Sequence, residues 1–292
     1  MTQISRLVFL TKKKTTKESS PDIKVDRISI VIPVKNNQRG IDNYLDNFLK
    51  THSPDIFPKE IVIVDNNSDT KTDIEKYRDK GLSLKLLTCK QAGPAAARNL
   101  GVEKSSGDWI VFNDSDCIPT KSLLTGYIKE SNGAIGYAGN VKSLGQDFLS
   151  KYYESQEILI PLKTESNVGE FIPQYLITAN TLVWKKTFEK VNGFNESIKI
   201  AGGEDIDLGL RLSEQGDLSY AFDSVVLHDF NEGLIGFYKR FDRYGQGNKM
   251  IENLWDIDMK PRPFRPNDRT LVNEILAKLQ YLFLLKGYGR QN

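Results

Sequence analysis

Four apolar runs, each bounded by polar residues, recur in the first 112 residues of the chain. They cover residues 28–34, 60–64, 82–87 and 109–112. Short continuous runs of this kind are typical of strands that are buried on both faces. Stretches with a helical pattern lie between the strands, at about 41–50 and 72–79. The alternation predicts an α/β fold with a Rossmann-like, mostly parallel sheet and helices on both of its faces.

The second half of the chain continues with strands and then turns helical. The apolar run 224–227 predicts a strand that ends at His228, and residues 237–247 predict a helix that a glycine ends. After a proline-rich linker, apolar residues from Leu271 to Phe283 recur at helical spacing. This stripe can pack on the domain, form a homodimer or lie on a membrane surface, and packing is the interpretation that we favour.

Composition narrows the class of protein. The chain has 292 residues, of which 39% are apolar and 27% charged, which suits a globular α/β domain with an appendage. A net charge of +2 is too small to indicate a nucleic-acid partner. Cys89 and Cys117 lack metal-binding spacing and indicate a reducing compartment. We therefore expect a cytoplasmic protein, without a signal peptide or a spanning helix, unless the stripe holds it at the inner face of the membrane.

Two carboxylates, Asp114 and Asp116, follow the buried run 109–112 directly. Ligands of open α/β sheets bind beyond the carboxyl ends of the strands. Hard cations such as Mg²⁺ and Mn²⁺ take carboxylate oxygens, commonly together with substrate phosphates. The turn therefore predicts a metal–phosphate site, although a solvated turn would have the same sequence.

Two predicted helix starts also carry candidate chemistry. Pro94 and three alanines open a helix in which Arg98 lies about one turn from the start, close to a natural phosphate site. An alanine-rich helix with a surface arginine is the simpler interpretation. Glu204 and Asp205 begin a second helix, where acidic residues stabilise the helix dipole. A carboxylate at such a position can also remove a proton from an attacking hydroxyl.

These motifs occur in the order found in one known family. The stretches that carry the match are Ile-Val-Ile-Pro-Val-Lys-Asn from residue 30, Ile-Val-Asp-Asn-Asn-Ser from residue 63, Ala-Ala-Arg-Asn-Leu-Gly from residue 96, Asp-Trp-Ile-Val-Phe-Asn-Asp-Ser-Asp from residue 108, Thr-Ala-Asn-Thr-Leu-Val-Trp from residue 178, Gly-Phe-Asn-Glu from residue 193 and Gly-Glu-Asp-Ile-Asp-Leu-Gly-Leu-Arg from residue 203. Over residues 27–228 the chain resembles the family 2 glycosyltransferases of the GT-A fold. The resemblance implies inverting transfer of a sugar from a nucleotide-diphosphate donor, with UDP-sugars favoured.

The resemblance also implies roles for single residues. The donor would be held by Pro33, Val34, Asn36, Asp65, Asn67, Arg98, Asp114 and Ser115. Within this set Asp65 would contact the nucleobase, Arg98 the phosphates and Asp114 the ribose. Asp116 would ligate Mn²⁺ or Mg²⁺, and His228 is a candidate second ligand, although histidines at strand ends are more often core or surface residues. Asp205 would be the general base, with Glu204 orienting the acceptor beside Asn180 and Gly203.

The resemblance divides the chain into a polar leader (1–26), a GT-A domain (27–232) and a helical extension (233–292). The GT-A domain has a nucleotide-sugar half (27–118) and an acceptor half (119–232). Acceptors within the range of the family are saccharides, lipid-linked sugars and proteins, so a role in polysaccharide or other glycoconjugate synthesis is expected. A sugar nucleotidyltransferase and a catalytically degenerate sugar-binding protein are the alternative interpretations.

Overall fold

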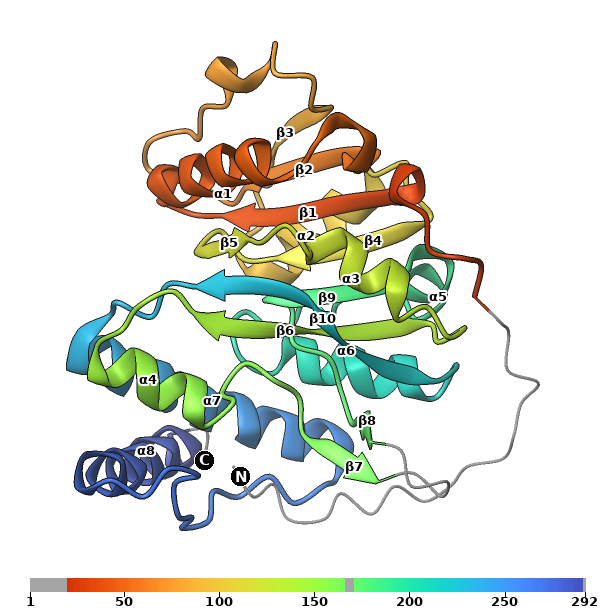
Figure 1. The fold of residues 1–292 in the computed structure, drawn as a ribbon. Coiled ribbons are helices and arrows are strands. Elements are labelled where there is room, and N and C mark those ends of the chain that lie inside the picture. The colour runs from red at the N-terminus through yellow and green to blue at the C-terminus, as the bar shows by residue number, and fades with distance from the viewer. Residues whose placement is uncertain (1–19, 166–170, 291–292) are drawn as a thin grey trace.

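A single sheet of eight strands forms the centre of the computed structural model, which describes residues 20–165 and 171–290 (Figure 1). The strand order is β3-β2-β1-β4-β9-β6-β10-β5. The strands are β1 (Ile28–Val34), β2 (Glu60–Asp65), β3 (Leu84–Thr88), β4 (Trp109–Asn113), β5 (Cys117–Pro119), β6 (Gly136–Ser143), β9 (Asn180–Trp184) and β10 (Leu218–His228). A separate ribbon pairs β7 (Lys163–Glu165) with β8 (Phe171–Pro173). Residues 1–19 of the predicted leader lie outside the described residues.

The first four strands run parallel, as the sequence predicts. Beyond β4 the pairing is mixed, because β9 is antiparallel to both β4 and β6, while β10 is parallel to β6. The short β5 pairs antiparallel with the end of β10, so that Cys117 lies opposite His228. This pairing brings the end of β10 next to the turn that follows β4, although more than a hundred residues separate the two in sequence.

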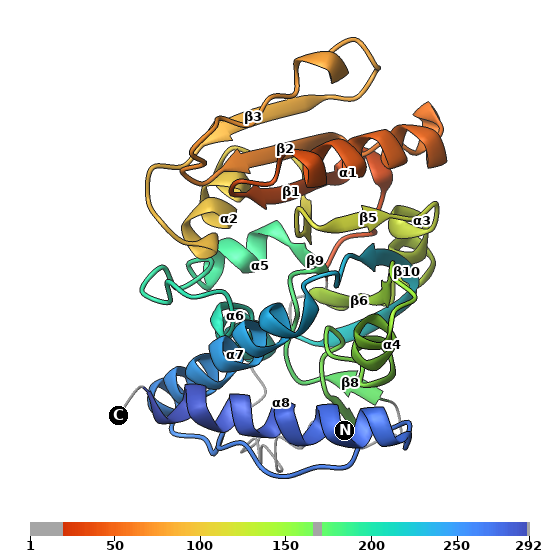
Figure 2. The same cartoon turned by 90° about the vertical axis from the view of Figure 1, so that its left-hand side faces the viewer.

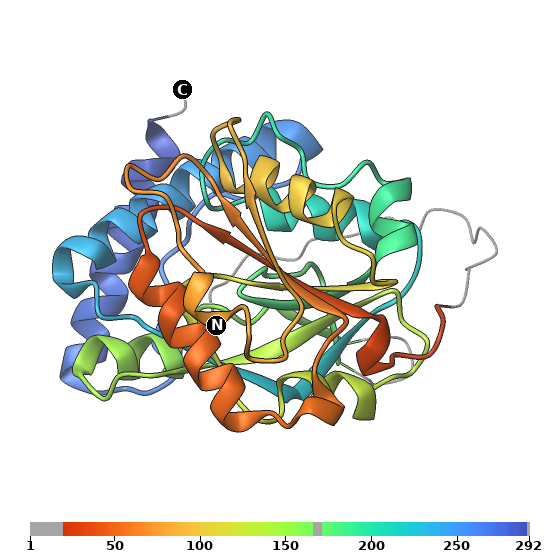
Figure 3. The same cartoon turned by 90° about the horizontal axis from the view of Figure 1, so that it is seen from above.

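Helices cover both faces of the sheet, which confirms the predicted α/β architecture (Figure 3). One face carries α1 (Gln38–Thr51) and α3 (Leu123–Lys129), and the other carries α2 (Pro94–Glu103), α5 (Lys185–Lys190) and α6 (Glu204–Ser213). In α1 the buried residues Ile41, Tyr44, Leu45 and Phe48 share one side of the helix. Pro94 opens α2, as predicted, and the alanines that follow it are buried.

The helix predicted at 72–79 is wrong. This segment contains only a 3-10 turn at Glu75–Tyr77. Two side chains hold the backbone in another conformation, because Asp65 accepts the Thr72 N–H and Asp73 accepts the Glu75 N–H. Side-chain bonds of this kind compete with helix formation.

The extension consists of α7 (Gly233–Trp255) and α8 (Leu271–Gly289), which lie side by side at the end of the molecule away from β3 (Figures 1 and 2). The two helices cross at glycines. A Cβ on Gly245 would overlap the carbonyl oxygen of Leu284, and one on Gly287 would overlap that of Asp242. The favoured interpretation of the C-terminal stripe, packing on the domain, therefore agrees with the structure.

The face of α8 that packs overlaps the predicted stripe only in part, because Leu279 and Phe283 pack against the core while other members of the stripe do not. Leu276, Ala277 and Leu284 are buried, whereas Leu271 and Leu282 of the predicted stripe are 79% and 53% exposed. Most positions of α8 are apolar, so the spacing of its leucines does not show which side of the helix is buried. The close contact with α7 at the glycines determines which side faces the protein. Among the described helices, none combines the length and apolar character that a membrane span requires.

Replacing Gly287 by alanine should weaken the contact between α7 and α8. The new methyl group must displace the Asp242 backbone, and overpacking of this kind typically lowers the free energy of unfolding by about 1–3 kcal/mol. Gly289→Ala is the matched control, because its Cβ would meet no atom within 4 Å. Urea denaturation measures both variants, and equal stability of the two would contradict the proposed role of the crossing.

Candidate active site

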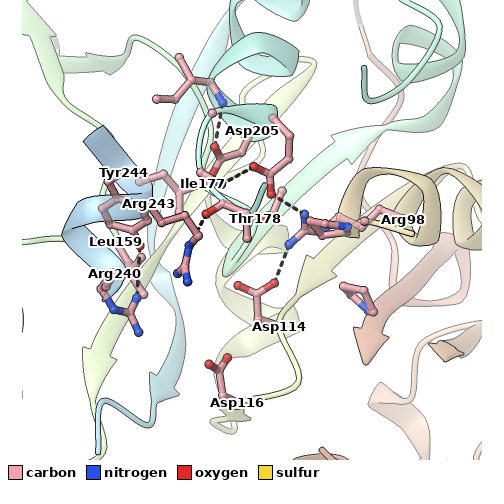
Figure 4. Close-up of a pocket in the computed structure, with 18 of the residues that line it drawn as sticks. Arg98, Asp114, Asp116, Leu159, Ile177, Thr178, Asp205, Arg240, Arg243 and Tyr244 are labelled. Carbon is pink, nitrogen blue, oxygen red and sulfur yellow. Dashed lines mark hydrogen bonds and ion pairs between the residues drawn. The ribbon is translucent and has the colours of Figure 1, made fainter. Parts of the chain in front are cut away.

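A cavity of about 630 Å³ opens beyond the carboxyl ends of β1, β2 and β4 (Figure 4). This volume is within the range of about 300–1,000 Å³ that is usual for small-molecule sites. The predicted site residues that line it are Pro33, Val34, Arg98, Asp114, Ser115, Asp116, Gly203, Glu204, Asp205 and His228. Those that the lining does not include are Asn36, Asp65, Asn67 and Asn180.

Asp116 and His228 meet at one side of the cavity, as the metal prediction requires. His228 Nε2 lies 3.4 Å from Asp116 Oδ1. The buried atoms Asp116 Oδ1 and His228 Nδ1 have no hydrogen-bond partner among the described residues. Cys117 Sγ lies in the same group but donates to the Ala179 carbonyl at 3.5 Å. A carboxylate oxygen without a partner beside an imidazole fits a divalent cation, which would satisfy the buried oxygen.

We predicted that Arg98 faces the phosphates of the donor. In the structure its terminal nitrogens bond carboxylates instead. Its Nη2 donates to Asp114 at 2.7 Å, and its Nη1 donates to Glu204 at 3.0 Å. Arg98 is only 4% exposed, and Figure 4 shows it joining the two carboxylates. A buried guanidinium needs such partners, so Arg98 holds the turn after β4 against the start of α6.

Glu204, like Arg98, has a structural role. It is 3% exposed, and its second oxygen accepts the Gly202 N–H at 2.7 Å. Both carboxylate oxygens are therefore used within the protein, which corrects the prediction that Glu204 orients the acceptor. Gly202 and Gly203 have φ values of +144° and +119°, a region that side chains disfavour, and this conformation lets the loop enter α6 next to the cavity.

Asp205 is the carboxylate of this pair that keeps an oxygen for the cavity. Its Oδ1 accepts the Ile206 N–H at 2.9 Å, and no described residue bonds its other oxygen. Burial, together with the charge of Glu204, raises the pKa of Asp205 from its ordinary value of 3.8 to about 7. Arg98 and the Ile206 N–H oppose this shift. A carboxyl group with a pKa near neutral pH is suited to proton transfer.

The predicted nucleobase contacts are arranged differently. Asp65 accepts the N–H groups of Ser68 and Thr72, so both of its oxygens shape the loop after β2. Burial opposes ionisation of Asp65, but these bonds outweigh it and lower the pKa of the carboxyl. Asn36 and Asn67 also bond to loop residues, namely Asp69 and Lys90.

The loops shaped in this way border the cavity. Lys35 and Asn66, the neighbours of these predicted residues, lie in the lining instead. The correction has a physical reason, because a short polar side chain at a strand end often bonds its own loop before it can reach a ligand.

Asn180 belongs to the core and not to the acceptor side. It is 1% exposed, donates to the carbonyls of Asn140 and Ser224, and accepts the Tyr127 hydroxyl. An amide whose groups are all bonded inside the sheet has no capacity left for an acceptor. The structure places Asn180 at the start of β9, a strand that is buried along its whole length.

α7 contributes a wall of the cavity that the predicted site residues do not include. Arg240, Phe241, Arg243 and Tyr244 line the cavity, and Figure 4 shows Arg240, Arg243 and Tyr244 together on one side of it. Leu159, which precedes β7, joins them. The mixture of aromatic and cationic side chains at 237–247 was the available signal, but a helical pattern alone does not show which surface the helix faces.

The family follows from a direct comparison. Residues 29–191, more than half of the chain, match the model of glycosyl transferase family 2. The chain therefore belongs to this family, as the motifs predicted. Residues 172–225 also match the family described as the N-terminal domain of galactosyltransferase.

The chain is also similar in sequence to individual glycosyltransferases. The chain is 26% identical over 231 residues to the pre-mycofactocin glycosyltransferase of Mycobacterium tuberculosis, an alignment that covers 75% of the chain and 46% of that protein. The chain thus spans less than half the length of this relative.

The fold is similar to two solved structures. Staphylococcus aureus TarS aligns with a TM-score of 0.56 and 18% identity, over 91% of this chain and 73% of that one. The mannosyltransferase PcManGT of Pyrobaculum calidifontis aligns with a TM-score of 0.59 and 16% identity, over 95% and 77%. At these identities the likeness establishes the GT-A fold.

Proposed function

We propose that the chain transfers a sugar from a nucleotide-diphosphate donor to an acceptor hydroxyl, with inversion and with a divalent metal ion. The observation that carries the proposal is the cavity in which the Asp116–His228 pair and Asp205 both lie. The first pair fits a metal ion beside a diphosphate, and Asp205 has the pKa of a general base. Membership of family 2 supports the nucleotide-sugar donor.

We assign the following roles to residues of the chain. Asp116 and His228 would hold the ion, which supplies positive charge where the leaving diphosphate becomes more negative. Asp114, fixed by Arg98, would face the ribose. Asp205 would accept the proton of the attacking hydroxyl. Direct attack on the face opposite to the leaving group gives inversion, and it needs one base and no covalent intermediate.

The proposal also covers which metal ion binds and which nucleobase the donor carries. Mg²⁺ prefers oxygen ligands in octahedral geometry, so the imidazole of His228 favours Mn²⁺. The structures of TarS include complexes with UDP and with UDP-GlcNAc, which supports a UDP-sugar. PcManGT was crystallised with GDP-Man and Mn²⁺, so GDP-sugars are the next donors to consider.

A screen of UDP-, GDP- and dTDP-sugars tests the proposal. With Mn²⁺ present, one group of donors should raise the melting temperature, because a ligand that binds only the folded state stabilises it. The same donors should be hydrolysed slowly by the wild-type protein when no acceptor is present. Protection without hydrolysis would point to a degenerate sugar-binding protein, and release of pyrophosphate from a nucleoside triphosphate would point to a nucleotidyltransferase.

A further inference from the structure

Three arginines line the cavity, and two of them already form ion pairs with carboxylates. Arg98 binds Asp114 and Glu204. Arg240 forms an ion pair with Glu232, bonds the Tyr244 hydroxyl and lies 5.4 Å from each of the Tyr153 and Phe230 rings. These contacts fix both guanidinium groups within the protein.

Arg243 differs from the other two, because it lies 5.7 Å from the centre of the Tyr244 ring but has no carboxylate partner among the described residues. Its Nε donates to the Ala201 carbonyl at 2.6 Å, while its terminal Nη1 and Nη2 atoms have no hydrogen-bond partner among the described residues. In Figure 4 the free end of this guanidinium projects into the cavity, between Arg240 and Asp114. Arg243 forms no ion pair with a described carboxylate, although Asp116 and Asp205 line the same cavity.

The tether to Ala201 gives Arg243 a defined direction. Ala201 precedes Gly202 and Gly203, and this loop packs so closely on α7 that a Cβ on Gly247 would overlap the Gly202 carbonyl. The helix and the loop therefore behave as one unit, and little side-chain freedom remains to be lost when a ligand binds. A guanidinium held in this way presents two parallel N–H donors, the geometry that matches a phosphate group.

We propose that Arg243 is a phosphate-binding residue that the C-terminal extension contributes to the active site. The inference rests on the proposed function, because the group expected beside Asp116 is the diphosphate of the donor. A phosphate group on the acceptor is the other source of the same chemistry. In either case α7 adds a guanidinium group to a cavity that Lys35 and Lys199 of region 27–228 also line.

Calorimetry of UDP with Mn²⁺ tests the inference on the full chain. Arg243→Gln should weaken UDP binding roughly ten- to hundredfold, since a charge-assisted hydrogen bond is lost. Uridine, which has no phosphate, should bind the variant and the wild type equally. Lys239→Gln is the matched control, because it removes the same charge from an exposed position of α7 and should leave UDP affinity unchanged. Arg243→Lys should be intermediate, since it keeps the charge and loses the two-pronged geometry.

A second arm separates the two sources of phosphate. Inorganic phosphate is titrated into protein already loaded with UDP and Mn²⁺. Unchanged UDP affinity in Arg243→Gln, together with loss of this second binding event, assigns Arg243 to a phosphate on the acceptor. If Arg243→Gln does not fold, the same two measurements on Arg243→Lys decide the question.

The negative outcomes are also distinct. If the Arg243 variants bind both UDP and phosphate as the wild type does, the inference is overturned; a residue that only tethers the loop would lower the melting temperature and leave both affinities intact. If donor hydrolysis continues in that case, the proposed function stands without Arg243. If the wild type binds neither UDP nor GDP, the proposed function fails first and this inference with it.

Discussion

Replacing Asp205 by asparagine should slow sugar transfer about 10²–10⁴-fold, the usual contribution of a general base, and should leave UDP affinity almost unchanged. Asparagine keeps the shape of the side chain and can still accept the Ile206 N–H, but it cannot take a proton. The measurement is the transfer rate at saturating donor, with UDP binding determined separately. A folded Asp205→Asn protein with near-normal turnover would remove Asp205 from the mechanism.

Asp207→Asn is the matched control for this experiment. Asp207 lies on the same helix, but it bonds Arg211 and the Trp255 indole instead of lining the cavity. This variant should lose stability and keep its turnover per folded molecule. The opposite pattern is expected for Asp205, so the pair separates a chemical role from a structural one.

The pKa of Asp205 adds a pH dependence with a definite sign. A base must be deprotonated, so kcat/KM should rise with pH through an apparent pKa of about 7. For stability the sign is reversed. The folded state binds a proton more tightly than the unfolded state, so this carboxyl lowers the stability as pH rises from about 4 to 7. Asp205→Asn should therefore be more stable than the wild type at pH 8, and the difference should shrink toward pH 4.

The sequence predicts those parts of the fold in which the local apolar pattern directly reflects burial in the sheet. Strands such as β1 and β2 are buried on both faces, so their apolar runs are continuous and easy to identify. The carboxylates at the end of β4 and the start of α6 were assigned to one site by the resemblance to family 2 and not by a local pattern. Both groups line the cavity, in agreement with that assignment.

The parts that could not be predicted depend on contacts between distant segments. Nothing local to Arg98 shows that Glu204, 106 residues later, will accept its hydrogen bond. The wall formed by Arg243 depends on the angle at which α7 crosses the domain, and the Gly245–Gly287 crossing that fixes this angle involves α8 as well. Asp65 illustrates a second limit of prediction from sequence. The motif identifies the residue, but it does not show whether the carboxylate bonds a ligand or the N–H groups of its own loop.

The dependence on metal gives the second large effect. Without Mn²⁺, or in Asp116→Ala, UDP should bind at least about tenfold more weakly, because removing a group that merely supports a metal ligand already costs 10–100-fold in metal affinity. Asp116 Oδ1 is buried beside His228 and has no hydrogen-bond partner in the described part of the chain, so the site fits a cation that this variant could no longer hold. His228→Gln should have a smaller effect of the same kind, since the carboxylate remains.

Asp108→Ala serves as the control for the metal experiment. Asp108 precedes β4 at the end opposite to the cavity and pairs with the surface residue Arg27. Its loss changes the net charge by the same unit as Asp116→Ala and should leave UDP binding and its response to Mn²⁺ unaltered. Titration of Mn²⁺ into each protein, followed by titration of UDP with and without a chelator, gives both affinities. Equal UDP affinity with and without Mn²⁺ in the wild type would exclude the metal role of Asp116 and leave Arg243, Lys35 and Lys199 as the candidate cations for the diphosphate.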